Sequence, residues 1–547
     1  MRILIIVIGL LILLFSACNN PSSSELNKTV FNYNELNGVT SLDPAAAANF
    51  ENIWPVNQMF NGLIEMDDHL NLQSGISKSF EISDDQKMYT FHLRTDVYFH
   101  DNVCFEKGKG RKVLASDFVF SFYRLYDSKV SSAAGLLEKV DRNEKNHYKG
   151  FEALNDSTFR IYLKEPFAPF LSILSMKYFS VLPFEAMAYY QQDFRKNPVG
   201  TGPFQFKMWD EGSKLILVKN PNYFEFDSNH VRLPYLDAVT VSFIKDKETA
   251  FMEFLAGKFD MLSGADAFNT SEVLNKEGDL RDFYSKKFVL QKEVFLKTDY
   301  IGFLVDSAMP VVKQSPIKLR ALRKAINMGF DRNKLIKYLR NNVGFAATSG
   351  FIPKGMNSFN TDSVKGYSYN PDRVKQLLIE AGYPNGKGLP EIVMHITDTY
   401  KEQAEFIQSQ LAENNIRVQI SIDKPSVLRQ AVNSGEYDFF KKSWVADYPD
   451  EDNFMGLFYS KNFTPQGVNF FHFSNPTFDG LYEKALNEPN QAVKNRLYQA
   501  MERIIIEESP VVPLYYDEVV RLVHKNIQNL GTNPMNLLNL KKVKKNP

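Results

Sequence analysis

Between residues 391 and 444, segments typical of strands alternate with segments typical of helices, and this alternation restricts the possible folds more than any other feature of the chain. Apolar, β-branched runs favour strands, whereas apolar residues recurring every three to four positions favour helices. Strands that alternate with helices of this length indicate βαβ units and a parallel sheet. The expected elements are strands at 391–397, 416–422 and 437–444, and helices at 402–414 and 426–433.

A loop rich in carboxylates follows the last of these strands. Asp447 comes three residues after Trp444, where the strand is expected to end. Ligands of open α/β sheets bind beyond the carboxyl ends of the strands, so we interpret Asp447 as the partner of a cationic group on a ligand. Two alternatives stay open. Asp447 could cap the loop structurally, or it could bind calcium with Asp450 and Asp452, although the glycine spacing of an EF-hand is absent.

The rest of the chain shows further local signals. Residues 316–328 read as one amphipathic helix, and Asp331 is expected to cap the next. Asn370 followed by Pro371 predicts another helix start. In the first half, strands are expected at 29–33, 215–218 and 238–244, and a helix at 249–255.

Composition excludes several classes of protein. The chain has 547 residues, enough for two to four domains, and its Lys+Arg and Asp+Glu totals are equal at 64. This balance gives no electrostatic reason to expect a nucleic-acid partner. The sequence carries no Gly-x-Ser-x-Gly or His-Glu-x-x-His motif and no cysteine cluster, and its eight histidines are scattered. We therefore expect neither catalysis, nor a metal site, nor a cofactor.

The N-terminus carries an export signal. Arg2 precedes an unbroken apolar run at 3–15, which is too short to span a bilayer comfortably and suits a signal peptide. Small residues before Cys18 are similar to a bacterial lipobox, so we expect Cys18 to be lipidated and 19–26 to act as a flexible tether. A simple signal peptide with an incidental cysteine is the alternative. If Cys18 carries lipid, Cys104 is alone, so no disulfide is expected despite the export signal.

Six segments, in this order, resemble the extracytoplasmic solute-binding proteins of family 5, which deliver oligopeptides, dipeptides or nickel to ABC importers. An insertion around 104–112 departs from the more compact family pattern. The segments are YTFHLRTDVYFHDN at 89–102, PVGTGPFQF at 198–206, LPYLDAVTVSFIKDKETAFMEFLAGKFD at 233–260, LRALRKAINMGFDRNKLI at 319–336, SWVADYPDEDNF at 443–454 and SPVVPLYY at 509–516.

The resemblance implies an α/β fold, a two-lobed clamshell of the type II-like periplasmic-binding-protein kind with an additional inserted domain. The first lobe would be discontinuous in sequence. The implied division is a signal peptide at 1–17, a lipid anchor and tether at 18–28, lobe I at 29–59 with 196–297 and 516–547, an inserted domain II at 60–195, and lobe II at 298–515.

The resemblance also implies a ligand site. In peptide-binding members an Asp shortly after a Trp pairs with the ligand's α-ammonium group, and Trp444 and Asp447 match that pattern. The peptide backbone would pair with extended protein segments, and a basic residue would meet the ligand carboxylate. Tyr515, which follows Pro513, either lines the cleft or packs in the core. The candidates for these contacts are Ser443, Val445, Asn49 and Phe50 for the backbone and Lys441 for the carboxylate.

The function implied is a peptide-binding lipoprotein of an ABC importer, monomeric and anchored outside the cytoplasmic membrane through Cys18. Its partners would be a peptide, an ABC permease and its ATPase, with no nucleic acid. The alternatives are a receptor for another solute (a nickel chelate, an oligosaccharide or an amine compound), a peptide-sensing or chaperone-like lipoprotein without an import role, and a secreted hydrolase.

Overall fold

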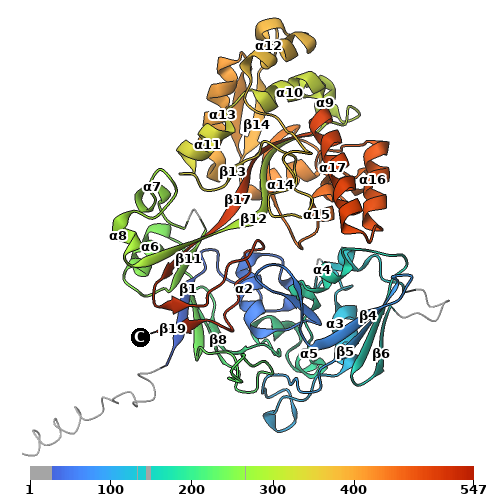
Figure 1. The fold of residues 1–547 in the computed structure, drawn as a ribbon, viewed down its shortest axis with the longest axis vertical. Coiled ribbons are helices and arrows are strands. Elements are labelled where there is room, and N and C mark those ends of the chain that lie inside the picture. Colours follow the sequence, from blue (N-terminus) through green and yellow to red (C-terminus); the bar gives the residue numbers. More distant parts are fainter. Residues whose placement is uncertain (1–27, 132, 143–149, 265–266, 547) are drawn as a thin grey trace, which may run out of the picture.

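The computed structural model describes residues 28–131, 133–142, 150–264 and 267–546. Figure 1 shows two bodies, one above the other, connected by the long strands β12 (Phe288–Phe303) and β17 (Val511–His524). The predicted signal peptide, Cys18 and nearly all of the tether lie outside the described residues. Within the described ranges, no helix has both the length and the apolar character needed to cross a membrane.

The upper body contains the predicted parallel strands. The middle strand of the three, β14 (Ile392–Ile396), pairs in parallel with β15 (Val418–Ile422) along its length and with β16 (Phe439–Val445) through His395 and Phe440. Residues on the inward faces, such as Ile392, Met394 and Phe439, are almost fully buried. The βαβ prediction is thus confirmed, with bounds of β14 (Ile392–Ile396), α13 (Lys401–Glu413), β15 (Val418–Ile422), α14 (Pro425–Asn433) and β16 (Phe439–Val445).

One continuous sheet runs from the upper body into the lower one. Strand β12 is antiparallel to both β16 and β17, and β17 continues the sheet into the lower body. Register shifts interrupt the β12–β17 pairing between Val294 and Thr298, where the two bodies meet. The lobe limits proposed at 297/298 and 515/516 both fall inside this strand pair. Beyond β17 come β11 (Met261–Ser263), β1 (Val30–Asn34), β10 (Ala238–Ser242), β9 (Lys214–Lys219) and β8 (Phe204–Asp210).

A second, four-stranded antiparallel sheet lies in the lower body, wholly within residues 60–195. Helix α3 (Ala115–Arg124) covers it with Phe118 and Phe122, whose rings lie 5.7 and 5.5 Å from that of Phe159. This local core gives the segment a sheet of its own, as an inserted domain requires. Its strands are β4 (Ser77–Ile82), β5 (Met88–Leu93), β7 (Thr158–Tyr162) and β6 (Phe151–Asn155).

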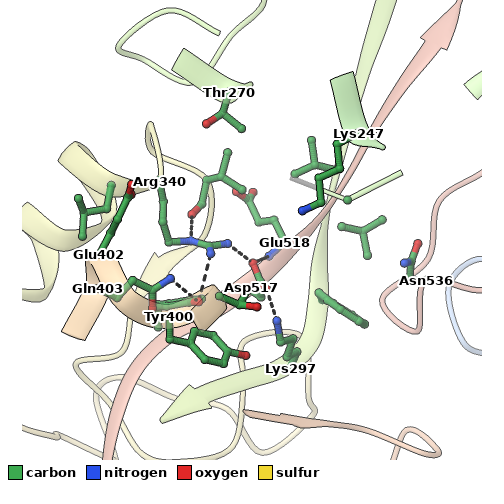
Figure 2. A pocket seen from close by; sticks show the side chains of 18 of the residues that line it. Lys247, Thr270, Lys297, Arg340, Tyr400, Glu402, Gln403, Asp517, Glu518 and Asn536 are labelled. Atoms are coloured by element: carbon green, nitrogen blue, oxygen red, sulfur yellow. Dashed lines mark hydrogen bonds and ion pairs between the residues drawn. The ribbon is translucent and has the colours of Figure 1, made fainter. Parts of the chain in front are cut away.

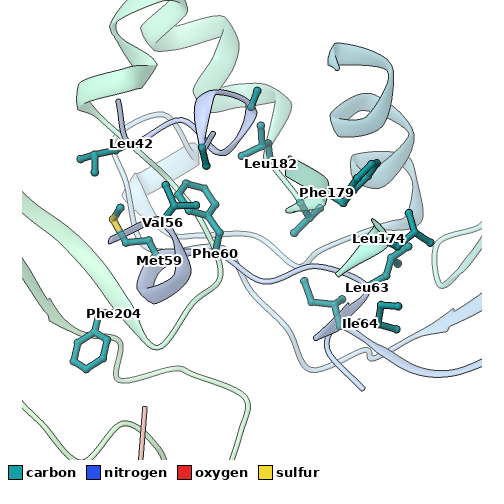
Figure 3. Packing of buried hydrophobic residues seen from close by; sticks show 14 of the residues in the cluster. Leu42, Val56, Met59, Phe60, Leu63, Ile64, Leu174, Phe179, Leu182 and Phe204 are labelled. Carbon is teal, nitrogen blue, oxygen red and sulfur yellow. The ribbon is translucent and has the colours of Figure 1, made fainter. Parts of the chain in front are cut away.

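Helix α2 (Phe50–Met59) lies in the middle of the lower body (Figure 1), and Figure 3 shows the buried side chains around its end. Val56 and Met59 are fully buried. The glycines of the PVGTGPF segment contact the end of the helix, where the N–H of Gly202 donates to the carbonyl of Met59 at 2.8 Å. A Cβ on Gly200 would come within 2.1 Å of the carbonyl oxygen of Met59, so only glycine fits there. The indole N–H of Trp54 donates to the backbone oxygen of Asn536 at 2.9 Å. These contacts hold α2 against the PVGTGPF segment at its end and against the C-terminal segment at Trp54.

The remaining predictions of local structure agree with the described elements, apart from one. Asp331 and Asn370 cap α11 and α12 by accepting backbone N–H groups, as expected. The helix predicted over 316–328 is wrong in its first turn, because Pro316–Lys318 forms a 3-10 turn and α10 begins at Arg320. Further elements are α4 (Phe170–Leu174), α5 (Phe184–Tyr190), α6 (Lys247–Leu255), α7 (Thr270–Val273), α8 (Asp282–Ser285), α9 (Pro310–Gln314), α10 (Arg320–Met328), α11 (Arg332–Leu339), α12 (Pro371–Glu380), α15 (Asp452–Met455), α16 (Pro476–Leu486), α17 (Gln491–Glu508), β2 (Ile64–Met66), β3 (Leu72–Ser74), β13 (Phe345–Ala346), β18 (Ile527–Gln528) and β19 (Lys544–Lys545).

Candidate ligand-binding site

A cavity of about 290 Å³ lies between the two bodies, next to the end of β16. The upper body contributes the loop from Val445 to Pro449. The lower body contributes the start of α2, including Asn49 and Phe50, together with residues 175–178 and parts of the C-terminal segment. The structure therefore brings four of the predicted site residues to one cavity: Asp447, Val445, Asn49 and Phe50.

Asp447 is exposed in this cavity and is oriented by one neighbour. Its backbone N–H donates to Oδ1 of Asn453 at 3.2 Å, and Nδ2 of Asn453 donates to its Oδ2 at 3.4 Å. The carboxylate opens to the cavity, but the surrounding protein partly desolvates it, and this desolvation raises the pKa of Asp447. The hydrogen bond from Asn453 lowers the pKa and offsets part of this effect. In the described part of the chain, the carboxylate has no ion-pair partner. A ligand ammonium group would supply the missing positive charge.

Trp444, which the sequence leaves between a cleft wall and the core, is not among the residues that line this cavity. Strand alternation turns its side chain to the other face of β16, where its ring lies 6.3 Å from that of Phe470. Its indole N–H donates to Oδ1 of Asn453 at 2.9 Å. Trp444 thus acts on Asp447 through Asn453, a residue that the sequence analysis missed. An amide six residues after the aspartate, in the same carboxylate-rich turn, was the available signal.

The edge of β16 is oriented to accept an extended ligand. The N–H of Ala446 donates to the carbonyl of Leu296, so the even-numbered residues of β16 direct their backbone N–H and C=O groups toward β12. Because the two sides of an antiparallel ladder alternate, the backbone groups of Ser443 and Val445 point away from β12. On that side, β14 pairs only with Phe440. The side chain of Ser443 is not part of the cavity wall, but its backbone can pair with a peptide passing this edge.

Lys441 is buried away from the cavity, in a chain of alternating charges. Its ammonium lies 2.6 Å from Oδ1 of Asp299, whose Oδ2 lies 3.0 Å from Lys297. Burial alone would raise the pKa of Asp299, but the two lysines hold it well below its usual range. Lys297 in turn pairs with Asp517 at 2.8 Å, and Asp517 with Arg340 at 2.5 Å. The structure therefore gives Lys441 a partner within the protein and does not bring it to Asp447.

A larger chamber of about 570 Å³ lies along the same face of β12 and β16 as the cavity, because Lys297 in its wall pairs across the two strands with Val445 in the cavity wall (Figure 2). Tyr515 lines this chamber and not the cavity of Asp447. The Tyr515 hydroxyl accepts a hydrogen bond from Arg340 at 3.1 Å, and the guanidinium also lies over its ring. The ring of Phe50, in the wall of the cavity, lies 6.1 Å from the ring of Phe295, in the wall of the chamber. The chamber is polar and contains both signs of charge, as Lys297, Arg340 and Asp517 show in Figure 2.

The calcium alternative for the loop is not supported by the positions of its other carboxylates. Asp450 pairs with the buried ammonium of Lys494 at 2.5 Å. Asp452 accepts the hydroxyl of Tyr448 at 2.8 Å. Neither group points toward Asp447 as a shared ligand set would. Over the described ranges, no group of three or more His, Cys, Asp or Glu side chains has the arrangement of a metal site.

Comparison with known proteins places these features in a family. The profile described as bacterial extracellular solute-binding proteins, family 5 Middle, matches residues 71–466. The glutathione-binding protein GsiB of Escherichia coli (strain K12) is 26% identical over 504 residues, 90% of each chain. Heme-binding protein A of Haemophilus influenzae is 28% identical over 473 residues, covering 84% of this chain and 81% of its own.

A solved structure extends the similarity to the whole fold. It is that of the periplasmic binding protein DppA from Helicobacter pylori, associated with an ABC transporter and in complex with the peptide STSA. The TM-score is 0.77 at 26% identity, and the match covers 96% of this chain and 100% of that one. The predicted two-lobed α/β architecture is therefore confirmed.

Proposed function

Because the chain belongs to the bacterial extracellular solute-binding proteins of family 5, we propose that it captures short peptides between its two lobes and delivers them to a membrane ABC permease. The observation that carries the proposal is the carboxylate of Asp447. It is oriented by Asn453, has no cationic partner among the described residues, and faces a cavity built by both bodies. Two of the three relatives described above have printed names that point the same way, since one binds glutathione and one holds a peptide, whereas the third is named for heme.

The chemistry of the site suits the amino end of a peptide. A hydrogen bond between an ammonium and a carboxylate contributes roughly 1.5–3 kcal/mol, more than a neutral one, and it does not depend on the ligand's side chains. The outward-facing backbone groups of Ser443 and Val445 can pair with the peptide main chain in the manner of an added strand. Together these contacts fix where the peptide begins and in which direction it leaves.

Ligand capture is proposed to close the two lobes. The cavity walls come from Val445–Pro449 above and from α2 and residues 175–178 below, so a ligand touches all of them only when the lobes are together. Contacts made only in the closed state shift the equilibrium toward it. The paired strands β12 and β17, with their register shifts near Val294 and Thr298, are the proposed hinge.

The chain is proposed to act outside the cytoplasmic membrane, as a monomer tethered through lipid on Cys18. In this setting its partners are the permease and the ATPase that drives import, and the protein itself catalyses no reaction. The division into lobe I, inserted domain and lobe II at the residues given above is part of the same proposal.

Native mass spectrometry of the purified protein tests the function. The proposal predicts bound species whose masses and fragments are those of short peptides, released intact on denaturation. A bound heme, metal chelate or sugar would contradict it. Incubation with defined peptides followed by mass analysis separates binding from hydrolysis, because a secreted hydrolase would return fragments.

A further inference from the structure

The cavity beside Asp447 has walls that are mainly apolar. Three methionines reach it from separate parts of the lower body: Met66 at the end of β2, Met176 before residues 177–178, and Met535 in the C-terminal segment. Methionine side chains are flexible and polarisable, so they adapt to apolar groups of different shape. Other apolar walls come from Ile53, Tyr178, Val445, Tyr448, Pro449 and Leu537.

The covalent geometry of a peptide determines which part of it enters this space. The ammonium nitrogen and the first side chain are attached to the same Cα, with an N–Cα bond of about 1.46 Å. If Asp447 binds the ammonium, the first side chain must lie in the same cavity. A volume of about 290 Å³ is near the lower limit of small-ligand pockets. It suits one residue rather than a whole oligopeptide.

We propose that this cavity is the subsite for the side chain of a peptide's first residue, and that it selects large apolar side chains such as Leu, Met or Phe. The inference rests on the proposed function and deepens it, since it names the class of peptide that the receptor prefers. The main chain beyond the first residue then leaves the cavity along the edge of β16. Selection at later positions is outside this subsite.

The charged groups in the wall argue against a basic first residue. Burial lowers the pKa of Lys177, partly offset by the nearby carboxylate of Glu65. A second cation beside Lys177 would therefore add repulsion where an ammonium is already poorly solvated. Among the described residues, Glu51 is the one carboxylate of the wall besides Asp447. If Glu51, and not the methionines, contacted the first side chain of the peptide, peptides that begin with lysine would bind best.

Calorimetric titration with tetrapeptides X-Ala-Ala-Ala tests the inference, because only the first side chain changes. We expect Leu and Met at X to bind about tenfold or more tightly than Ala or Ser, since each methylene in an apolar pocket contributes strongly to discrimination. Lys at X should bind most weakly. Equal affinities across the series, or tightest binding of the Lys peptide, would overturn the subsite. Failure of every peptide to bind would overturn the proposed function as well, so the two failures are distinguishable.

A charge introduced into the wall gives the second test. Met176 is half-buried, so Met176→Glu should fold, which thermal melting checks. The variant should weaken Leu-Ala-Ala-Ala about tenfold and strengthen Lys-Ala-Ala-Ala. Met252→Glu is the matched control, because Met252 lies on α6, 62% exposed and outside the cavity wall, and should change neither peptide. An equal effect of Met176→Glu on both peptides would contradict a side-chain subsite at this position.

Discussion

The side-chain amide of Asn453 orients the carboxylate of Asp447, because Nδ2 of the amide donates a hydrogen bond to Oδ2 of the carboxylate at 3.4 Å. The same amide accepts the backbone N–H of Asp447 and the indole N–H of Trp444. The ring of Trp444 packs against that of Phe470, so the indole N–H keeps its position and restricts rotation of the amide that accepts it. The aspartate is thereby oriented before any ligand binds, which reduces the side-chain conformational entropy lost on binding.

Asn453→Ala should weaken peptide binding while leaving the fold intact. Removing one hydrogen-bonding neighbour of the carboxylate is expected to cost about 1 kcal/mol, or roughly fivefold in Kd. Isothermal titration with a short peptide measures it. Asn197→Ala is the control, since Asn197 also donates one hydrogen bond, to the Asp193 carbonyl, but lies far from the cavity wall. Equal Kd values for both variants would show that Asn453 has no positioning role.

The buried pair of Lys441 and Asp299 should matter for stability more than for ligand recognition. Both side chains are almost completely buried, so Asp299→Asn, which leaves two lysines without their shared carboxylate, should destabilise the protein by about 3–5 kcal/mol. Urea denaturation measures this loss. Lys441→Met should leave the ratio of affinities for free and C-terminally amidated peptides unchanged, because Lys441 pairs with Asp299. If the variant lost affinity only for the peptide with a free C-terminal carboxylate, Lys441 would be a partner of the ligand carboxylate.

Glu502 is expected to make stability depend on pH. This residue of α17 is buried and accepts the N–H of Ile352 at 2.8 Å. Burial raises its pKa from 4.5 to about 8. The folded protein therefore keeps a proton that the unfolded chain releases, so the contribution of this group to the free energy of unfolding falls as pH rises from about 4.5 to about 8.

Glu502→Gln keeps the acceptor oxygen and removes the titration. Relative to the parent, the variant should gain a few kcal/mol at pH 9 and much less at pH 5. Urea denaturation of both proteins at the two pH values gives the comparison. Parallel pH profiles for parent and variant would refute the assignment.

The proposed anchor is tested by Cys18→Ser. We expect this variant to move from the membrane fraction to the soluble fraction while its peptide affinity is unchanged. Cys104→Ser should stay with the membranes, because Cys104 is a half-buried thiol in the lower body. Membrane retention of the Cys18→Ser protein would show that lipid on Cys18 is not the anchor.

Much of the upper body could be predicted from the sequence because its signals are local. Strands β14, β15 and β16 and their connecting helices follow from apolar periodicity alone. Asp331 and Asn370 were recognisable as helix caps because a cap bonds to backbone groups two or three residues away. The position of Asp447 just beyond β16 followed from the same reasoning.

The crossing of β12 and β17 could not be predicted in this way. Their paired residues, such as Phe288 and His524, are separated by more than two hundred positions, and no local pattern encodes such a pairing. The ion chain from Lys441 to Arg340 depends on the pairing of β12 with β16 as well as with β17, so the burial of Lys441 could not be predicted from the sequence either. The same applies to Tyr515, whose place in the second chamber depends on where β17 passes.

The central claim is that Asp447 binds the amino end of a peptide, and titration of a free peptide and its N-acetylated copy tests it most directly. With the parent protein, acetylation should weaken binding about tenfold or more, which corresponds to roughly 1.5–3 kcal/mol for the lost charge-assisted hydrogen bond. With Asp447→Asn, the two peptides should bind alike. Equal affinity of the parent protein for the free and acetylated peptides would contradict the account.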